Sequence, residues 1–304
     1  MMSEIKPEKI ELEESLQELL NHGMGSDLHS HSNPKKKINY KKAVRDMSWL
    51  LPYSLGYYLI KKTFPETLIK STIRSESIIW PEYLEFLKSK KIIVPALDHD
   101  DCLMNERYKM SKKLGIPFGG EFTVKMNKDK LTHITVNGIN LDEYKKLLEL
   151  RENFDDFVEY ASEINSRKGK IAIWAHPFSV TNRDSIPINK LDVLEKWDGP
   201  VEINISHGSE AYITTIASLV KGNKIVATTD SHNPETLGKA ATIVEGSKDF
   251  YDIVNGIKYD DARLFFKLEN KDDVVDRIKT VFSYHLKNVA DELRLPNFSK
   301  KMGK

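Results

Sequence analysis

The 304-residue sequence predicts an α/β protein whose strands close into a barrel, and two observations lead to this prediction. Short apolar runs that are typical of buried strands alternate with segments of helical periodicity between residues 26 and 232. Histidine and carboxylate side chains stand where these apolar runs stop. Because the carboxyl ends of parallel barrel strands meet at one mouth, where active sites are built, this placement predicts a functional site there.

The bulk composition excludes several classes of protein. The 46 Lys and Arg residues nearly balance the 45 Asp and Glu residues, so the chain lacks the basic excess of a dedicated nucleic-acid binder. Cys102 is the single cysteine, which rules out an internal disulfide and a thiolate zinc cluster. Residues 1–20 lack an apolar run of the signal-peptide type, and no stretch reaches the length of a membrane span. We therefore expect a cytoplasmic protein without a membrane partner and of undetermined oligomeric state.

The first part of the chain contains a helix and a long aromatic segment before the regular pattern begins. Residues 4–22 carry leucines on one helical face and are followed by glycines, so we expect residues 1–25 to form a capping helix. Residues 40–70 are rich in aromatic and aliphatic side chains and contain Pro52 and Pro65. We expect this insertion to form a buried helical hairpin, while a lid over the site or a dimer surface stays open as an alternative.

From residue 81 the elements follow in a regular order. Helices are expected over 81–88, 103–114, 141–167 and 211–221. Strands are expected over 91–97, 116–121, 133–136, 170–175, 201–205 and 224–229, with a hairpin turn around 127–130. A short strand over 263–268 and a helix over 272–293 follow. This order predicts a barrel domain over residues 26–270, which includes the insertion, and a C-terminal helix with its tail over residues 271–304.

The first candidate ligands lie in the segment Asp27-Leu28-His29-Ser30-His31. Two histidines one residue apart point the same way on an extended segment, because strand side chains alternate with period two. The two imidazoles could therefore bind the same metal ion. Asp27 is placed to orient a ligand through its second ring nitrogen.

Further candidates end the other apolar runs. Any single one could be a hydrogen-bonded core residue, so the set rather than any member indicates a site. Asp98 is suited to orient a metal ligand by a hydrogen bond rather than to bind the metal itself. Glu202 and Asn204 end a strand and either line the mouth of the barrel or cap the sheet. These strand-end candidates are Asp98, His99, Glu121, His176, Asp230 and His232.

Six short motifs, taken in order, resemble the PHP family, the polymerase and histidinol phosphatase domain. The family pattern runs from a strand ending in His-x-His through Thr-Asp-His, Gly-x-Glu, a His that opens a strand and a His-Pro pair to Ser-Asp-x-His. This sequence has Asp27–His31, Leu97–Asp100, Gly119–Glu121, His133–Ile134, Ala175–Pro177 and Thr229–His232. The resemblance covers residues 26–245 and implies a distorted, TIM-like (β/α) barrel of seven strands that holds up to three divalent metals.

Carried over residue by residue, the resemblance implies three metal positions. One metal would be bound by His29, His31, Glu121 and Asp230. A second would share Glu121 as a bridge and add His133 and His176. A third would use His99, His232 and a side chain from the loop after the first strand. Glu76 is the candidate for that side chain, because residues 76–82 resemble the family's Asp-Gly-x-x-Ser-Pro-Glu with Glu in place of Asp.

The ligand types point to a hydrolase. Imidazoles and carboxylates without sulfur suit Zn, Mn or Fe without choosing among them. Two or three such ions favour in-line displacement at phosphorus by a metal-activated water. We therefore predict a phosphoesterase, similar to histidinol phosphatases, that hydrolyses a phosphomonoester or a small phosphodiester. Asp98, His99 and Arg183 are its predicted catalytic residues, and Arg183 and Asn204 are predicted to contact the small phosphorylated substrate.

Three other functions stay open at this point. A nuclease acting on nucleic-acid ends would use the same chemistry but needs a local basic groove that the bulk charge does not indicate. Another metallohydrolase could share such a barrel, because unrelated reactions recur on one fold. A PHP-like barrel could also be a binding module without catalysis.

Overall fold

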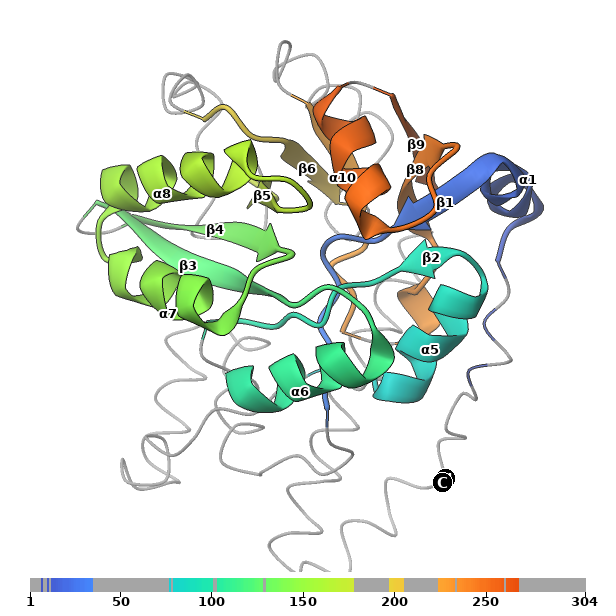
Figure 1. Ribbon diagram of the computed structural model, residues 1–304, viewed down its shortest axis with the longest axis horizontal. Helices are drawn as coiled ribbons and strands as arrows, with labels where there is room; N and C mark the ends of the chain where they lie inside the picture. Colours follow the sequence, from blue (N-terminus) through green and yellow to red (C-terminus); the bar gives the residue numbers. More distant parts are fainter. Residues whose placement is uncertain are drawn as a thin grey trace, which may run out of the picture.

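The computed structural model describes most of the chain between residues 12 and 267 (Figure 1). The described residues are 12–34, 79–100, 103–127, 130–177, 197–204, 224–232, 234–259 and 261–267, together with residues 7, 10 and 77. Several expectations lie outside them: the insertion over 40–70, Glu76, Arg183, the helix over 211–221, and the helix and tail over 271–304. The division of the chain into three parts therefore stays a prediction.

The described strands form two open sheets of a mixed α/β protein. The first sheet has the order β2 (Ile92–Ile93), β1 (Gly23–Ser26), β8 (Ala240–Glu245), β9 (Ala262–Phe266), and only its β1–β2 pair is parallel. The second has the order β3 (Gly119–Asn127), β4 (Lys130–Asn137), β5 (Ile171–Ala175), β6 (Val201–Asn204), β7 (Ile225–Thr228). Its first two pairs are antiparallel and its last two are parallel. The α/β class is thus confirmed.

The expected closed, parallel barrel is not what the described strands form. Of the strand expected over 91–97, only β2 forms a continuous ladder. Pro95 has no N–H with which to continue that ladder, and Ala96 and Leu97 form single bridges instead. Beyond β1 and β2 the chain keeps an extended course and meets the second sheet through single parallel bridges. These bridges are Ser30–Ser231, Ala96–Phe118 and His99–Glu121.

Two other expectations need correction. No strand is expected over Ala240–Glu245, yet β8 is a central strand between β1 and β9 and is buried from Ala240 to Val244. The single helix expected over 141–167 is two helices, α7 (Leu141–Leu150) and α8 (Phe154–Ser166). The break arises because the Asn153 side chain accepts hydrogen bonds from the first backbone N–H groups of α8, which starts a new helix.

The other local expectations agree with the structure. Helices α5 (Pro81–Ser89) and α6 (Met104–Leu114) lie where periodicity places them, and the hairpin turn joins β3 to β4. Gly115 ends α6 at a φ of 58°, a left-handed conformation that glycine adopts without strain. Helix α1 (Glu14–His22) confirms the second half of the helix expected over 4–22, but it begins only at Glu14, since residues 10, 12 and 13 are described and lie outside it.

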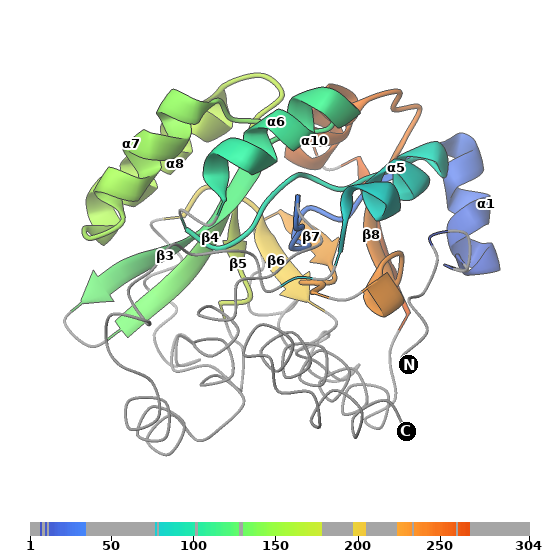
Figure 2. The ribbon, with the colours of Figure 1, turned by 90° about the horizontal axis from the view of Figure 1, so that it is seen from below.

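Apolar cores on several sides hold the strands in place. Helices α7 and α8 pack side by side on β3 (Figures 1 and 2), and their core includes Phe122, Phe157 and Trp174. Helices α1, α5 and α6 share another core with the first sheet. A third core joins the two sheets to α10 (Phe250–Lys258) through residues such as Leu28 and Val226. Leu28 directly precedes His29, so this packing fixes where the His-x-His segment begins.

We searched the described helices for one that could cross a membrane. None of them combines the necessary length with the necessary apolar character.

Candidate metal centre

The predicted ligands that the structure describes come together in one place. They extend from the ends of β1, β2, β5 and β7 and from within β3 and β4. Register explains why His133 joins them: it pairs with Ala175, the last residue of β5, and so lies beside His176. The eight residues are His29, His31, His99, Glu121, His133, His176, Asp230 and His232.

Four of these residues form a compact group of ligand atoms. The Nε2 atom of His29 lies 3.3 Å from both Glu121 Oε2 and Asp230 Oδ1. The Nε2 atom of His31 lies 3.1 Å and 3.0 Å from the same two oxygens. A tetrahedral ion with bonds of about 2.1 Å separates its ligand atoms by about 3.4 Å. The group therefore has the spacing of a metal site.

Unsatisfied polar atoms support a cation at this group. His29 Nε2 and Glu121 Oε2 are buried, and although charged groups lie 2.9–3.3 Å from them, none of these contacts has the geometry of a hydrogen bond. Leaving such atoms without a partner costs free energy, and a shared cation would satisfy both at once. Nitrogen and oxygen ligands without sulfur fit Zn, Mn or Fe. The residues present thus fit the predicted metals.

Glu121 also faces a second set of imidazoles. Its Oε1 atom lies 2.8 Å from His133 Nδ1 and 3.3 Å from His176 Nε2, so the carboxylate lies between the first two predicted groups, and its role as a bridge between metals stays a prediction. Its Oε2 atom lies 2.9 Å from His99 Nδ1. His99 thus approaches this set as well as the third one, to which the resemblance assigns it.

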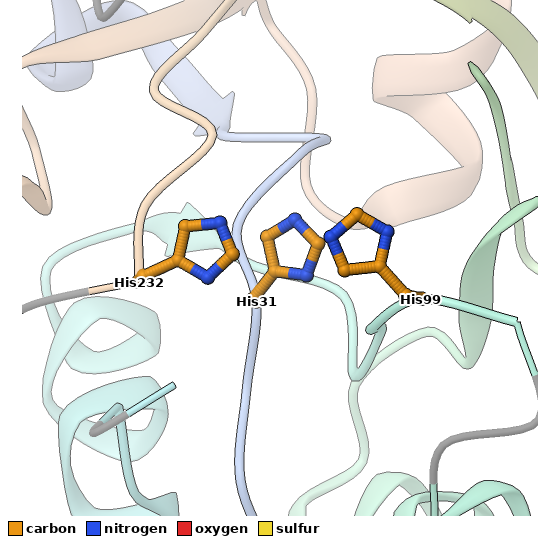
Figure 3. Close-up of side chains that lie close together, drawn as sticks. All are labelled: His31, His99 and His232. Atoms are coloured by element: carbon orange, nitrogen blue, oxygen red, sulfur yellow. The ribbon is translucent and has the colours of Figure 1, made fainter. Parts of the chain in front are cut away.

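The third group consists of His31, His99 and His232, whose rings lie side by side (Figure 3). His31 lies in the middle, with its ring centroid 4.1 Å from that of His232 and 4.5 Å from that of His99. Glu76 rather than His31 is the residue expected in this group, and Glu76 lies outside the described residues. The structure therefore adds His31 to the third group.

A second layer of carboxylates orients the two histidines of the His-x-His segment. Glu202 Oε2 lies 2.8 Å from His29 Nδ1, and Asp98 Oδ1 lies 3.0 Å from His31 Nδ1. The expectation that Asp27 orients a histidine is wrong, because its carboxylate accepts hydrogen bonds from the backbone N–H and hydroxyl of Thr229. The role belongs to Glu202, and a charged residue inside the apolar run of β6 was the signal for it.

The buried charges of the centre shift one another's pKa values. Burial opposes protonation of His29, but the carboxylates of Glu202, Asp230 and Glu121 outweigh it and raise its pKa well above the ordinary value. Burial alone would raise the pKa of Glu121, yet the surrounding imidazoles hold it well below the ordinary value. Without a cation His29 and His31 therefore favour the protonated form, and metal binding to these two rings would release protons.

Asn204 and Arg183 are the two predicted substrate contacts. Asn204 is buried at the end of β6, opposite Thr228 of β7, whose hydroxyl donates to Glu202. Its predicted contact with substrate stays a prediction. Arg183, predicted to bind phosphate, belongs to the part of the chain that the structure does not describe.

Comparisons with known proteins return distant structural likenesses alone. No protein-family model and no curated protein matches the chain. PsfC from Pseudomonas syringae is similar with a TM-score of 0.40 and 12% identity, over 87% of this chain and 98% of that one. PfuEndoQ, a lesion-specific endonuclease from Pyrococcus furiosus, is similar with a TM-score of 0.44 and 13% identity, over 79% of this chain and 57% of that one. A proposed metal-dependent phosphoesterase from Bifidobacterium adolescentis is similar with a TM-score of 0.34 and 12% identity, over 77% of this chain and 95% of that one.

Proposed function

We propose that this protein is a metal-dependent phosphoesterase that hydrolyses a small phosphorylated substrate at a centre of two or three divalent ions. One observation carries the proposal: the carboxylate of Glu121 lies within 3.3 Å of five imidazoles from four segments of the chain. A carboxylate offers about four lone-pair sites, so Glu121 cannot satisfy five rings by hydrogen bonds alone, whereas several cations that share it could take all five rings as ligands. The five rings belong to His29, His31, His99, His133 and His176.

The exposure of the ligands indicates where substrate would enter. The side chains of His29 and His31 are fully buried, while those of His99 and His232 are 21% and 26% exposed. Substrate would therefore approach the centre from the side of His99 and His232, the more exposed ligands. When bound, the ions would supply Lewis acidity and a water of lowered pKa for in-line displacement at phosphorus.

We further propose that the two sheets continue each other as the distorted seven-stranded barrel that the resemblance implies. Parallel bridges between the chain segments support this. His31–Leu97 connects the course of β1 to that of β2, Ala96–Phe118 connects β2 to β3, and Ser30–Ser231 connects β7 back to β1.

The proposal is tested by measuring product release after loading with Mn²⁺ or Zn²⁺. The panel contains a chromogenic phosphomonoester, a chromogenic phosphodiester, histidinol phosphate, nucleotides and a short DNA strand. His29→Ala, Glu121→Ala and Asp230→Ala should each lower turnover by more than about 100-fold. Removing a residue that only hydrogen-bonds to a metal ligand costs about 10–100-fold in activity, and removing the ligand itself should cost more. His22→Ala is the matched control, since His22 is exposed at the end of α1.

Turnover close to that of the unmodified protein in all three variants would overturn the proposal. If no substrate of the panel released product although bound metal had been demonstrated, a different metallohydrolase or a binding module would be favoured. Preference for the DNA strand would instead identify a nuclease.

A further inference from the structure

Arg107 of α6 is a buried cation close to the metal centre. Its side chain is completely buried, and a buried guanidinium is costly unless it is paired and hydrogen-bonded. Its Nη1 atom lies 3.4 Å from Asp98 Oδ2, and its Nη2 atom donates to the Tyr144 hydroxyl at 3.3 Å. That hydroxyl in turn donates to the backbone carbonyl of Asp100. Arg107 is thus built into the turn that carries Asp98 and His99.

Asp98 faces Arg107 with one oxygen and the metal centre with the other. Its Oδ1 atom accepts the backbone N–H of His99 at 2.8 Å and lies 3.0 Å from His31 Nδ1. The opposite nitrogen of His31 points at Glu121 and Asp230, 3.1 Å and 3.0 Å away. The contacts therefore run without a gap from α6 through Asp98 and the His31 ring to the ligand group.

We propose that Arg107 is a positioning residue for the metal centre, acting through Asp98 on His31. The guanidinium holds Oδ2 on the side of α6, which leaves Oδ1 aimed at His31 Nδ1. His31 belongs to two of the three ligand groups, so the orientation of its ring affects both. This inference rests on the proposed function insofar as the centre binds metal, but not on which ester it hydrolyses.

The test measures metal affinity rather than activity, with Mn²⁺ or Zn²⁺ titrated into the full-length, metal-stripped protein in a calorimeter. Arg107→Met keeps a side chain of similar length but removes the charge and the hydrogen-bond donors. It should weaken metal binding by about 10-fold, the lower limit of the loss seen when a residue that supports a metal ligand is replaced. Arg107→Lys keeps a cation beside Asp98 and should bind within about 3-fold of the unmodified protein. Arg263→Met is the matched control, because Arg263 is 61% exposed on β9 and pairs with Glu245.

A double-mutant cycle separates positioning from a general structural role. Asp98→Asn removes the charge on which Arg107 acts, so adding Arg107→Met should cause no further loss of metal affinity. The double variant also leaves no unpaired charge at this pair, which makes it the variant to use if Arg107→Met alone does not fold.

Three results have distinct meanings. Unchanged affinity in Arg107→Met, or a further loss in the double variant relative to Asp98→Asn, overturns the inference and leaves the proposed function standing. An unmodified protein that binds no metal overturns both. An unmodified protein that binds metal but hydrolyses no ester overturns the proposed reaction alone, and the cycle still decides the role of Arg107.

Discussion

Two residues of the centre have a positive φ, a backbone conformation that residues other than glycine rarely adopt. His176 has a φ of 30° and Asp230 a φ of 49°, each just beyond the end of a strand. Such conformations cost about 1–3 kcal/mol and persist only where the surroundings hold them. Here the backbone N–H of His176 donates to Glu202, and that of Asp230 donates to the carbonyl of His29. Two of the five described non-glycine residues with positive φ therefore lie where ligands turn towards the centre.

Glu202 leads to a prediction at the same scale. Its carboxylate contacts the His29 ring, the backbone of His176 and the hydroxyl of Thr228. Glu202→Gln keeps the shape but removes the charge beside His29, so metal affinity should fall by about 10–100-fold, measured by calorimetry. Glu163→Gln, on the exposed face of α8, is the matched control. Unchanged affinity in Glu202→Gln would show that His29 needs no charged partner.

At the scale of the element, the start of α7 is stabilised by a capping box. The Asn140 side chain accepts from the backbone N–H groups of Asp142 and Glu143, and the Glu143 carboxylate accepts the backbone N–H of Asn140. Glu143 also pairs with Arg167 and Lys170, beyond the end of α8. One carboxylate therefore ties the start of α7 to the end of α8, next to the sheet.

These contacts predict how stability depends on pH. Burial raises the pKa of Glu143, but hydrogen bonds and charge from Lys170 and its other partners outweigh it and leave the pKa below the ordinary value. A carboxyl group whose pKa is lowered on folding stabilises the protein above its unfolded pKa, and this contribution disappears as the pH falls through the folded pKa.

Glu143→Gln should therefore lower the free energy of unfolding by about 1 kcal/mol at pH 7, the partners being partly exposed to solvent. The difference from the unmodified protein should shrink as the pH falls below about 4.3, where free glutamate takes up its proton. Urea unfolding at several pH values measures it. A difference that stays constant with pH would contradict this account.

At the scale of the whole molecule, the metal centre lies where the two sheets meet. His29, His31, Asp98 and His99 follow strands of the first sheet, and the other ligands belong to the second. Bound ions would therefore connect the sheets and add to the core they share through Leu28 and Val226.

Metal should accordingly stabilise the fold. At a free metal concentration 100 times Kd, the free energy of unfolding should rise by about 2.7 kcal/mol, and a chelator should reverse the gain. Thermal unfolding with and without Mn²⁺ or Zn²⁺ measures it, and the gain should be lost in His29→Ala but kept in His22→Ala. An equal gain in both variants would place the stabilising metal elsewhere.

Local patterns were sufficient for much of the fold. The α/β class, helices α5 and α6 and the β3–β4 hairpin follow from periodicity, capping residues and turn residues, which act over a few positions along the chain. The convergence of His29 with His31 follows likewise, because spacing of two on an extended segment fixes their common direction. The break at Asn153 was missed, since continuous apolar periodicity hides a cap in the middle of a helical stretch.

The residue pattern shows which side chains could meet: imidazoles and carboxylates, without sulfur, at the ends of buried strands. Their arrangement follows from the fold alone, with two open sheets, with Glu202 rather than Asp27 behind His29, and with Arg107 behind Asp98. Separation along the chain explains this difference. His29 and Glu202 are 173 positions apart, and which carboxylate reaches a ring over such a separation depends on how strands and helices pack.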